Sequence, residues 1–263
     1  MAQEIPPNER RAEVILQELL RAGKVSVGPL ARRLKVSAAT IRRDLSELEG
    51  RGLLRRSHGG ALSIQPLLYE PFRHTSNYQE QERQRIAEKR RIGLVAAELV
   101  VDGEFLAIGA GTTATQVARS ICLHRGLTVL TNAINVAMEL SHRDDLKVIV
   151  TGGLLSGDWF ALVGPGAIQS VGELFVDKVF IGVDGIHVEH GMTTNYPDQA
   201  TIHRAMMRQA RRKIVVADHR KLGATGSALI CPLDGVDILI TDRGATDEAV
   251  APFVARGIEV RKA

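Results

Sequence analysis

The sequence is poor in cysteine and contains neither a long apolar run nor an apolar leader. Its two cysteines, Cys122 and Cys231, lie far apart, without CxxC spacing or a histidine cluster beside them. That arrangement argues against a structural zinc site and favours a reducing compartment. No apolar run approaches the ~20 residues of a membrane-spanning helix, and residues 1–11 are polar and charged. We therefore expect a cytoplasmic protein with no membrane segment, no metal site and no cofactor.

The chain also lacks the short motifs that mark common enzyme classes. The patterns GxSxG and HExxH are absent, as are the P-loop GxxxxGK and the complete dinucleotide pattern GxGxxG. The eight histidines are scattered along the chain. The single tryptophan, Trp159, stands in a Gly- and Asp-containing loop, where it either covers a ligand or packs on the surface. These absences favour a protein that is not an enzyme.

Positive charge is concentrated in the first quarter of the chain. Residues 1–62 hold twelve Lys or Arg against seven Asp or Glu, whereas the rest of the chain holds 22 against 23. A basic segment attached to a nearly neutral body is typical of nucleic-acid binding. A solvated basic surface gives the same count, so charge alone does not separate the two interpretations.

Residues 25–44 within this basic segment have the pattern of two short helices joined by a tight turn, a helix-turn-helix. Apolar residues recur at spacings of mostly three, four and seven, which predicts a stripe facing a small helical core. Ser37 suits the N-cap of the second helix. Its other face carries small residues followed by arginines: Ser37, Ala38, Ala39, Thr40, Arg42 and Arg43. Such a face suits entry into a DNA major groove; the alternative is a helical hairpin with a solvated basic face.

The flanking segments complete a winged helix-turn-helix. A first helix is predicted over residues 8–22, and a hairpin over 53–64 follows the second helix of the motif. Arg55, Arg56 and His58 belong to this hairpin and are placed where phosphates or a minor groove can be reached. We assign residues 8–63 to this domain and residues 64–80, which contain two prolines and no clear period, to a linker.

Residues 81–263 have the pattern of an open, mostly parallel α/β domain. A charged helix with a solvated arginine-rich half is predicted from about Gln81. Apolar runs of strand length then alternate with helix-length segments, and each run ends in small or polar residues. In such sheets the ligand binds beyond the carboxyl ends of the strands. We therefore expect these end residues to converge on one pocket.

Residues 109–113, GAGTT, are the most specific phosphate candidate in that pocket. A glycine-rich turn from strand to helix lets backbone N–H groups approach an anion at the positive end of the helix. The alternative is a tight turn capped by Thr112 or Thr113. Asp184 can accept hydrogen bonds from sugar hydroxyls and Lys221 can bind a phosphate, although a turn aspartate and a solvated lysine are the simpler interpretations.

Two separate parts of the chain resemble one family, the DeoR-type bacterial repressors. Residues 36–61 closely follow that family's VSxxTIRRDLxxLexxGxxxRxHGGA pattern. GAGTT, TN, TGG, DKVFIGVDGI, GMTT and ADHRKLG stand in the order of its sugar-phosphate-sensing domain, which is related in fold to ribose-5-phosphate isomerase and coenzyme A transferases. The resemblance implies a repressor of a sugar-metabolism operon. Its partners would be double-stranded operator DNA, a phosphorylated sugar and further copies of itself, as a dimer or tetramer.

The resemblance also assigns contacts residue by residue. DNA contacts fall on the recognition-helix face 37–43 and on the three wing residues named above. Effector contacts fall on Gly111, Thr112, Thr113, Thr131, Asn132, Gly152, Gly153, Asp184 and Lys221.

Two departures bear on the pocket. Asp198 and Gln199 replace the family's glutamate pair, and Asp184 is followed by Gly-Ile-His instead of the acidic cluster of the isomerases. The missing carboxylates argue against proton transfer, which needs a positioned base. The alternative function is a sugar-phosphate isomerase-like enzyme fused to a DNA-binding domain.

Overall fold

The computed structural model describes residues 7–63 and 77–263. The chain divides into two compact units, residues 1–67 and 68–263. Most of the predicted linker, residues 64–76, lies outside the described residues, and residues 77–80 belong to a helix. Along the described ranges, no helix has the length and apolar content needed to cross a membrane.

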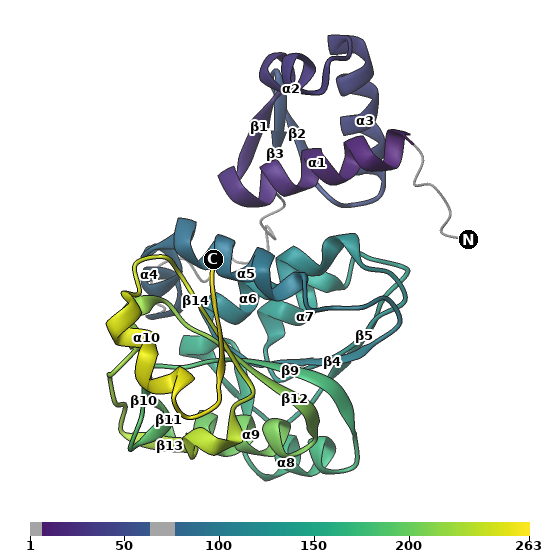
Figure 1. Ribbon diagram of the computed structural model, residues 1–263. Coiled ribbons are helices and arrows are strands. Elements are labelled where there is room, and N and C mark those ends of the chain that lie inside the picture. Colours follow the sequence, from purple (N-terminus) through teal and green to yellow (C-terminus); the bar gives the residue numbers. More distant parts are fainter. Residues whose placement is uncertain (1–6, 64–76) are drawn as a thin grey trace, which may run out of the picture. The chain divides into compact units, whose positions relative to one another are not determined.

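The first unit is the predicted winged helix-turn-helix. Its elements are α1 (Pro7–Ala22), β1 (Lys24–Ser26), α2 (Val27–Leu34), α3 (Ala38–Gly50), β2 (Arg55–Ser57) and β3 (Gly60–Leu62) (Figure 1). The three strands form an antiparallel sheet in the order β1-β3-β2. Ile15, Leu19, Ile41, Leu45 and Leu48 are buried, so the predicted apolar stripe does form a core. Leu54, which was expected to lie in a strand, instead packs into this core just before β2.

Two polar contacts fix the position of α3. Ser37 is its N-cap, with the hydroxyl oxygen accepting a hydrogen bond from the Thr40 N–H at 3.1 Å. Asp44, buried in the middle of the helix, accepts two bonds from the Arg11 guanidinium at 2.9 and 3.0 Å. The ion pair joins α1 to α3, and it raises the pKa of Arg11 through its hydrogen bond to Asp44. The outer face of α3 is thus held in one orientation.

The second unit is built on a seven-stranded sheet in which every pair of neighbours is parallel. Its strands, in sheet order, are β15 (Glu259–Lys262), β14 (Ile238–Thr241), β12 (Ala210–Val216), β9 (Val176–Gly182), β4 (Phe105–Ile108), β5 (Thr128–Thr131) and β6 (Lys147–Val150). The predicted mostly parallel α/β architecture is therefore confirmed. The polar edge strand β15 was not predicted, because its sequence, EVRK, has no apolar run.

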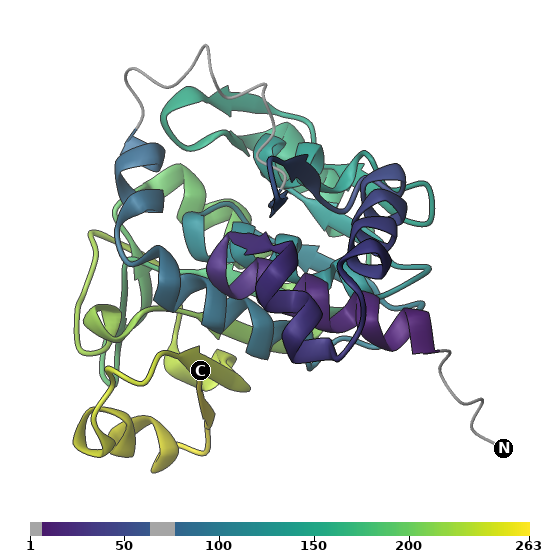
Figure 2. The same ribbon diagram turned by 90° about the horizontal axis from the view of Figure 1, so that it is seen from above.

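Helices cover both faces of this sheet. They are α5 (Ile86–Ala97), α6 (Thr112–Ser120), α7 (Ile134–Leu140), α8 (Pro165–Gly172), α9 (Pro197–Arg208) and α10 (Asp247–Val254). In Figure 1, α5, α6 and α7 lie above the sheet, and α8 and α9 lie below it. Figure 2 shows the C-terminal segment with α10 and β15, in yellow, gathered at one edge.

Two smaller sheets complete the unit. The antiparallel strands β10 (Gly185–His187), β11 (Gly191–Thr194) and β13 (Ala228–Cys231) form one of them. The hairpin of β7 (Leu154–Ser156) and β8 (Ala161–Val163) forms the other. Both interrupt the strand-helix alternation, and both lie close to the carboxyl ends of the parallel strands in sequence.

The single charged helix predicted from Gln81 is wrong, because two helices occupy this region. α4 (Asn77–Arg83) ends before Arg85, whose left-handed φ of 53° interrupts the helical path before α5 begins. The break lets α4 pack on α6, and the buried Tyr78 side chain is hydrogen-bonded to Thr115 of α6 and Asn135 of α7. Burying the Tyr78 ring removes a large apolar surface from water, and this stabilises the fold by more than the interruption of the helix destabilises it.

Gly93 lies at a close approach of α5 to α6, and replacing it with alanine tests this contact. A Cβ atom there would lie 2.5 Å from the Gln116 carbonyl oxygen. We expect Gly93→Ala to lower the free energy of unfolding by roughly 1–3 kcal/mol through overpacking. Urea unfolding followed by circular dichroism measures this. Gly172→Ala in α8 is the matched control, because nothing lies within 4 Å of the new Cβ; it is expected to be neutral or stabilising by under about 1 kcal/mol. Equal effects of the two changes would contradict the close approach.

Candidate functional site

The first candidate site is the outer face of α3. Ile41, Asp44, Leu45 and Leu48 turn inward, so the opposite side of the helix faces solvent. Of the predicted DNA-contacting residues on it, Ser37, Ala39, Arg42 and Arg43 are exposed, and Ala38 and Thr40 are half-buried. The Thr40 hydroxyl lies 2.9 Å from that of Ser37. The face therefore presents small side chains at the start of the helix and two guanidinium groups one turn later.

The wing adds further positive charge to this unit. Arg55, Arg56 and His58 are all exposed on β2 and the turn that follows it. Arg56 is held against α3, because its N–H donates to the Glu49 carboxylate at 2.8 Å and its Nη1 donates to the Ser46 hydroxyl at 3.0 Å. This arrangement can contact the DNA backbone on both sides of an inserted helix.

The second candidate site is a pocket in the second unit with an empty volume of about 520 Å³, part of it open to solvent. Its lining residues are Gln81, Lys89, Ala110, Gly111, Thr112, Thr113, Trp159, Gly182, Val183, Asp184, Thr194, Gln199, Ala217, Asp218 and Lys221. Many of them follow the carboxyl ends of β4, β9 and β12, which is where open parallel sheets bind ligands.

The strand-to-helix turn at Gly111 forms one wall of the pocket. Gly111 is the N-cap of α6 with φ 134° and ψ 154°, a conformation that only glycine adopts without strain. Thr112 and Thr113 begin the helix, and the first N–H groups of a helix have no acceptor within it. The Ala110 N–H is fixed by the Asn132 amide oxygen at 3.0 Å. The wall thus presents backbone N–H groups at the positive end of a helix, a place where proteins can bind anions.

Two lysines supply cationic groups to the same pocket. Lys89 on α5 is 3% exposed, and its ammonium group donates to the Gln81 carbonyl oxygen. Burial lowers its pKa to about 8, although the Asp218 charge partly opposes the shift. The Lys221 ammonium group lies 3.3 Å from Asp184 Oδ1. A dianionic ligand would stabilise the charged form of both lysines.

The two carboxylates in the pocket are already held by other groups. Asp184 Oδ2 accepts hydrogen bonds from the Thr194 hydroxyl and the Asn195 N–H, each at 2.9 Å. Asp218 is buried and pairs with the Arg220 guanidinium at 2.9 Å. Burial acts to raise the pKa of Asp218, but the hydrogen bonds and charge of Arg220 outweigh it and the pKa is lowered. Both groups are therefore acceptors in fixed orientations.

One aromatic residue, Trp159, lines the pocket and packs against two tyrosine rings. The Trp159 ring lies 5.0 Å from that of Tyr196 and 6.3 Å from that of Tyr78, measured between centroids. Its indole N–H is buried and finds no hydrogen-bond acceptor among the described residues. Trp159 thus both packs on neighbouring rings and lines the pocket, so the two interpretations of its loop are compatible.

The pocket brings together five of the nine predicted effector residues: Gly111, Thr112, Thr113, Asp184 and Lys221. The other four do not line it. Thr131 and Asn132 are fully buried, and their side chains bond to the backbone of Ile108, Ala110, Ala133 and Leu162. Gly152 and Gly153 turn the chain from β6 into the β7–β8 hairpin. Asn132 acts on the pocket indirectly, because it holds the turn before α6.

Several lining residues were not predicted, and Lys89 is the most consequential. It was assigned to a solvated face, yet it lies three residues from both Ile86 and Ile92. This helical spacing puts Lys89 on the apolar side of α5, and it was the available signal. Asp218 follows the apolar run of β12, and this place at a strand end was its signal, whereas Gln81 had no comparable signal. Gln199, one of the two departures from the family pattern, is buried and lines the pocket, whereas Asp198 is exposed.

Comparisons with known proteins agree across both units. The family described as DeoR-like helix-turn-helix domain matches residues 11–66, and DeoR C terminal sensor domain matches residues 84–243. The transcriptional repressor AccR of Agrobacterium fabrum is 34% identical over 90% of each chain. The HTH-type transcriptional regulator GlpR of Haloferax volcanii is 36% identical over 97% of each chain.

Among solved structures, ribose 5-phosphate isomerase A of Methanocaldococcus jannaschii is similar with a TM-score of 0.36 and 17% identity, over 51% of this chain and 52% of that one. The full-length sorbitol operon regulator SorC of Klebsiella pneumoniae has a TM-score of 0.37 and 12% identity, over 94% and 99%. The two domain matches and the curated relatives confirm the family that the sequence motifs predict: the chain belongs to the DeoR family of DNA-binding transcription regulators.

Proposed function

We propose that the protein represses transcription by binding operator DNA through α3 and the wing, and that a phosphorylated sugar bound in the pocket releases it. The observation that carries the effector assignment is the pairing of a helix N-terminus with two lysines in one pocket, beside fixed carboxylates. Relatives named as transcriptional repressors support repression over activation.

The pocket suits the two halves of a sugar phosphate. The N–H groups at the start of α6, with Lys89 and Lys221, can bind the phosphate dianion. Asp184 and Gln199 can hydrogen-bond the hydroxyls, and Trp159 offers both an apolar face and an unpaired N–H. Uncharged sugars would offer no anion to the two lysines and the helix end. We therefore expect the phosphate to be required.

A route from pocket to DNA-binding domain passes through α4. The Lys89 ammonium group is held by the Gln81 carbonyl of this helix. A bound phosphate competes for that ammonium group and so weakens its bond to α4. α4 is the first described element after residues 64–76, which connect it to the winged helix in sequence. Release requires that the effector bind the two arrangements of the chain with different affinities.

We further propose that the protein acts as a homo-oligomer that places two recognition helices on operator half-sites. The open edge strand β6 exposes Ile149 and Val150, and the adjacent β7 exposes Leu154 and Leu155. Apolar side chains along an unpaired strand edge favour pairing with another chain. A second copy is the partner that a symmetric operator requires.

A regulatory role is favoured over an isomerase-like enzyme by the state of Asp184. A general base must be free to accept a proton from the substrate. Asp184 instead accepts bonds from Thr194, Asn195 and Lys221. Detectable turnover of pentose or hexose phosphates, lost in Asp184→Asn, would favour the enzyme instead.

Titration calorimetry tests the regulatory mechanism directly. Operator fragments are first captured from genomic DNA, and a panel of sugar phosphates is screened for release. Each active compound is then titrated into the full chain with and without operator. Because coupling is reciprocal, operator must weaken sugar-phosphate binding by the factor by which the sugar phosphate weakens operator binding. Equal affinities in the two titrations would rule out the mechanism.

Arg42→Ala and Arg43→Ala test the recognition helix. An arginine that reads a base is expected to contribute roughly 1–3 kcal/mol to operator binding, and its loss should relax specificity at one position. An arginine that contacts phosphate should instead weaken binding to all sequences and reduce the salt dependence. Fluorescence anisotropy at several salt concentrations separates the two cases. Arg91→Ala, on α5 of the other unit, is the control, and no effect from either α3 variant would argue against this helix as the reader.

A further inference from the structure

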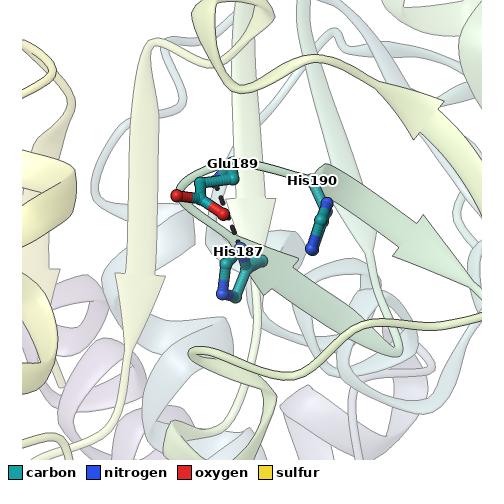
Figure 3. Close-up of side chains that lie close together, drawn as sticks. All are labelled: His187, Glu189 and His190. Carbon is teal, nitrogen blue, oxygen red and sulfur yellow. Dashed lines mark hydrogen bonds between the residues drawn. The ribbon is translucent and has the colours of Figure 1, made fainter.

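The tip of the β10–β11 hairpin gathers two histidines and a glutamate. His187 pairs across the hairpin with Gly191, so only Val188, Glu189 and His190 form the turn. One potential ligand atom from each of His187, Glu189 and His190 lies within 4.8 Å of the others (Figure 3). His187 is half-buried, whereas Glu189 and His190 are exposed. The cluster is therefore accessible to an ion from solvent.

The hairpin preorganises these side chains. The two imidazole rings are stacked, with centroids 4.7 Å apart and an interplanar angle of 23°. His187 Nδ1 accepts a hydrogen bond from the Glu189 N–H at 3.1 Å, which folds the turn back over the first ring (Figure 3). A neighbouring strand, β13, pairs with β11 and supports the hairpin from its other side. Little chain entropy remains to be lost when a ligand binds.

We propose that this tip, the HVEH turn, is a binding site for a divalent transition metal of the zinc class. Two imidazole nitrogens and one carboxylate are a ligand set that zinc accepts, with the fourth position left to water or another ligand. Calcium and magnesium prefer sets made only of oxygen and are excluded by the two histidines. The sequence predicts no metal site because HVEH matches no common motif; the hairpin brings the ligands together despite the unusual spacing.

Binding requires two small local changes. Ligand atoms around a tetrahedral ion with bonds of about 2.0–2.1 Å lie roughly 3.3 Å apart. A pair at the 4.8 Å limit of this cluster must therefore close by about 1.5 Å. Rotation of the exposed Glu189 and His190 side chains supplies this movement. His187 must also give up the hydrogen bond from the Glu189 N–H. If the metal binds Nδ1, this atom is no longer an acceptor; if the metal binds Nε2, the ring proton is on Nδ1, which again cannot accept. Both changes are confined to the turn.

The base of the same hairpin is a wall of the effector pocket. Asp184 directly precedes β10 and Thr194 ends β11, and their side chains are joined by a hydrogen bond of 2.9 Å. Both residues line the pocket, whereas none of the three metal ligands does. A metal at the tip therefore stabilises a hairpin that the effector contacts at its base, without occupying the effector site.

Zinc titration of the full chain tests the proposal independently of DNA and sugar. The chain is freed of metal with a chelator and titrated with zinc chloride in competition with a chromophoric chelator near neutral pH. We expect one equivalent to bind in the wild type. His187→Ala and His190→Ala should each weaken that binding roughly tenfold or more, and Glu189→Gln should weaken it by a smaller factor. Magnesium chloride should give no binding at this site.

His58→Ala is the matched control, because it removes an exposed histidine from the other unit. It should bind zinc as the wild type does. Zinc should also raise the unfolding temperature of the wild type and of this control, but not of the His187→Ala/His190→Ala double variant, since only a native-state ligand stabilises by mass action. The proposal is overturned if the wild type binds no zinc, or if the double variant binds it with unchanged affinity and stoichiometry. Neither result depends on whether a sugar phosphate binds the pocket.

Discussion

We expect Lys89→Met to weaken sugar-phosphate binding about 100-fold at neutral pH, which is the loss expected for a charge-assisted hydrogen bond in a partly buried site. The side chain reaches the pocket from α5 and is 3% exposed, so solvent screens its charge weakly. Methionine keeps the length and removes the charge. The fold should tolerate the change, because the buried ammonium group is itself costly to desolvate. Calorimetry gives the affinity, and a thermal melt that is unchanged or raised shows that folding is intact.

The pH dependence of binding tests the role of the Lys89 charge more specifically than the affinity at one pH does. Burial lowers its pKa to about 8, so the free pocket loses this charge as pH rises above 8. The phosphate binds the protonated form, and affinity should therefore fall by up to tenfold per pH unit above that value. Below about pH 6 the phosphate becomes a monoanion and affinity falls again. In Lys89→Met the fall in affinity above pH 8 should be lost, whereas the fall below about pH 6 should persist.

Lys147→Met is the matched control, since Lys147 is an exposed lysine on β6 and does not line the pocket. It should bind with wild-type affinity and the full pH profile. If Lys89→Met retained the fall in affinity above pH 8, the titrating group would be another residue, and the assigned role of Lys89 would be wrong.

Sequence periodicity predicted the elements of this fold wherever burial follows a regular pattern. The stripe through Ile41, Leu45 and Leu48 and the apolar runs of the parallel sheet are signals of this kind. Strand ends were equally informative, because parallel topology forces the turn at Gly111 and the loops at Asp184 and Lys221 to meet. Local pattern and global topology agree at these positions.

Features that depend on contacts between distant segments could not be predicted. Thr131 and Asn132 occupy strand ends as expected, but neighbouring backbone groups take their hydrogen bonds. The break at Arg85 exists because Tyr78 finds a buried partner on α6, 37 residues away in sequence. The same break places the Gln81 carbonyl oxygen where it accepts a hydrogen bond from the Lys89 ammonium group, and both residues line the pocket. Periodicity could have placed Lys89 on the inward side of α5, but the partner that it meets there is set by tertiary packing, which no sequence pattern shows.

Arg119 joins α4 to the rest of the sensor domain through an ion pair, and Arg119→Met is expected to lower the free energy of unfolding of this domain by roughly 3–5 kcal/mol. Arg119 on α6 donates to Glu82 of α4 at 2.9 Å and to Glu139 of α7 at 2.8 Å. The Glu139 side chain is only 4% exposed. Removing the arginine leaves this carboxylate buried without its cation. The loss of stability is large in such a case, because the remaining charge stays out of water without compensation. Urea unfolding of the full chain measures the lost free energy of unfolding, read from the transition of the sensor domain.

Two comparison variants separate a buried charge from a general loss of contact. Arg211→Met breaks an exposed ion pair with Asp177, in which the charged atoms are 3.6 Å apart and the Arg211 side chain is 80% exposed. This change should lower the free energy of unfolding by less than about 1 kcal/mol. Arg119→Met/Glu139→Gln removes the uncompensated charge and should recover a large part of the stability lost in Arg119→Met. If the single and double variants were equally unstable, the loss would come from packing and not from the buried carboxylate.

The sign of the pH dependence follows from Glu139. Burial raises the pKa of this carboxyl group even though Arg119 opposes the shift, and removing Arg119 must raise the pKa further. A carboxyl group whose folded pKa exceeds its unfolded pKa binds protons better in the folded state. Stability is therefore lost as pH rises from the unfolded pKa through the folded one. The deficit of Arg119→Met should be smaller at pH 5 than at pH 8, and this difference should vanish in the double variant. Because Glu82 also loses its partner, the attachment of α4 to α6 is weakened at both pH values. Operator binding should therefore become less sensitive to the effector even where the domain remains folded.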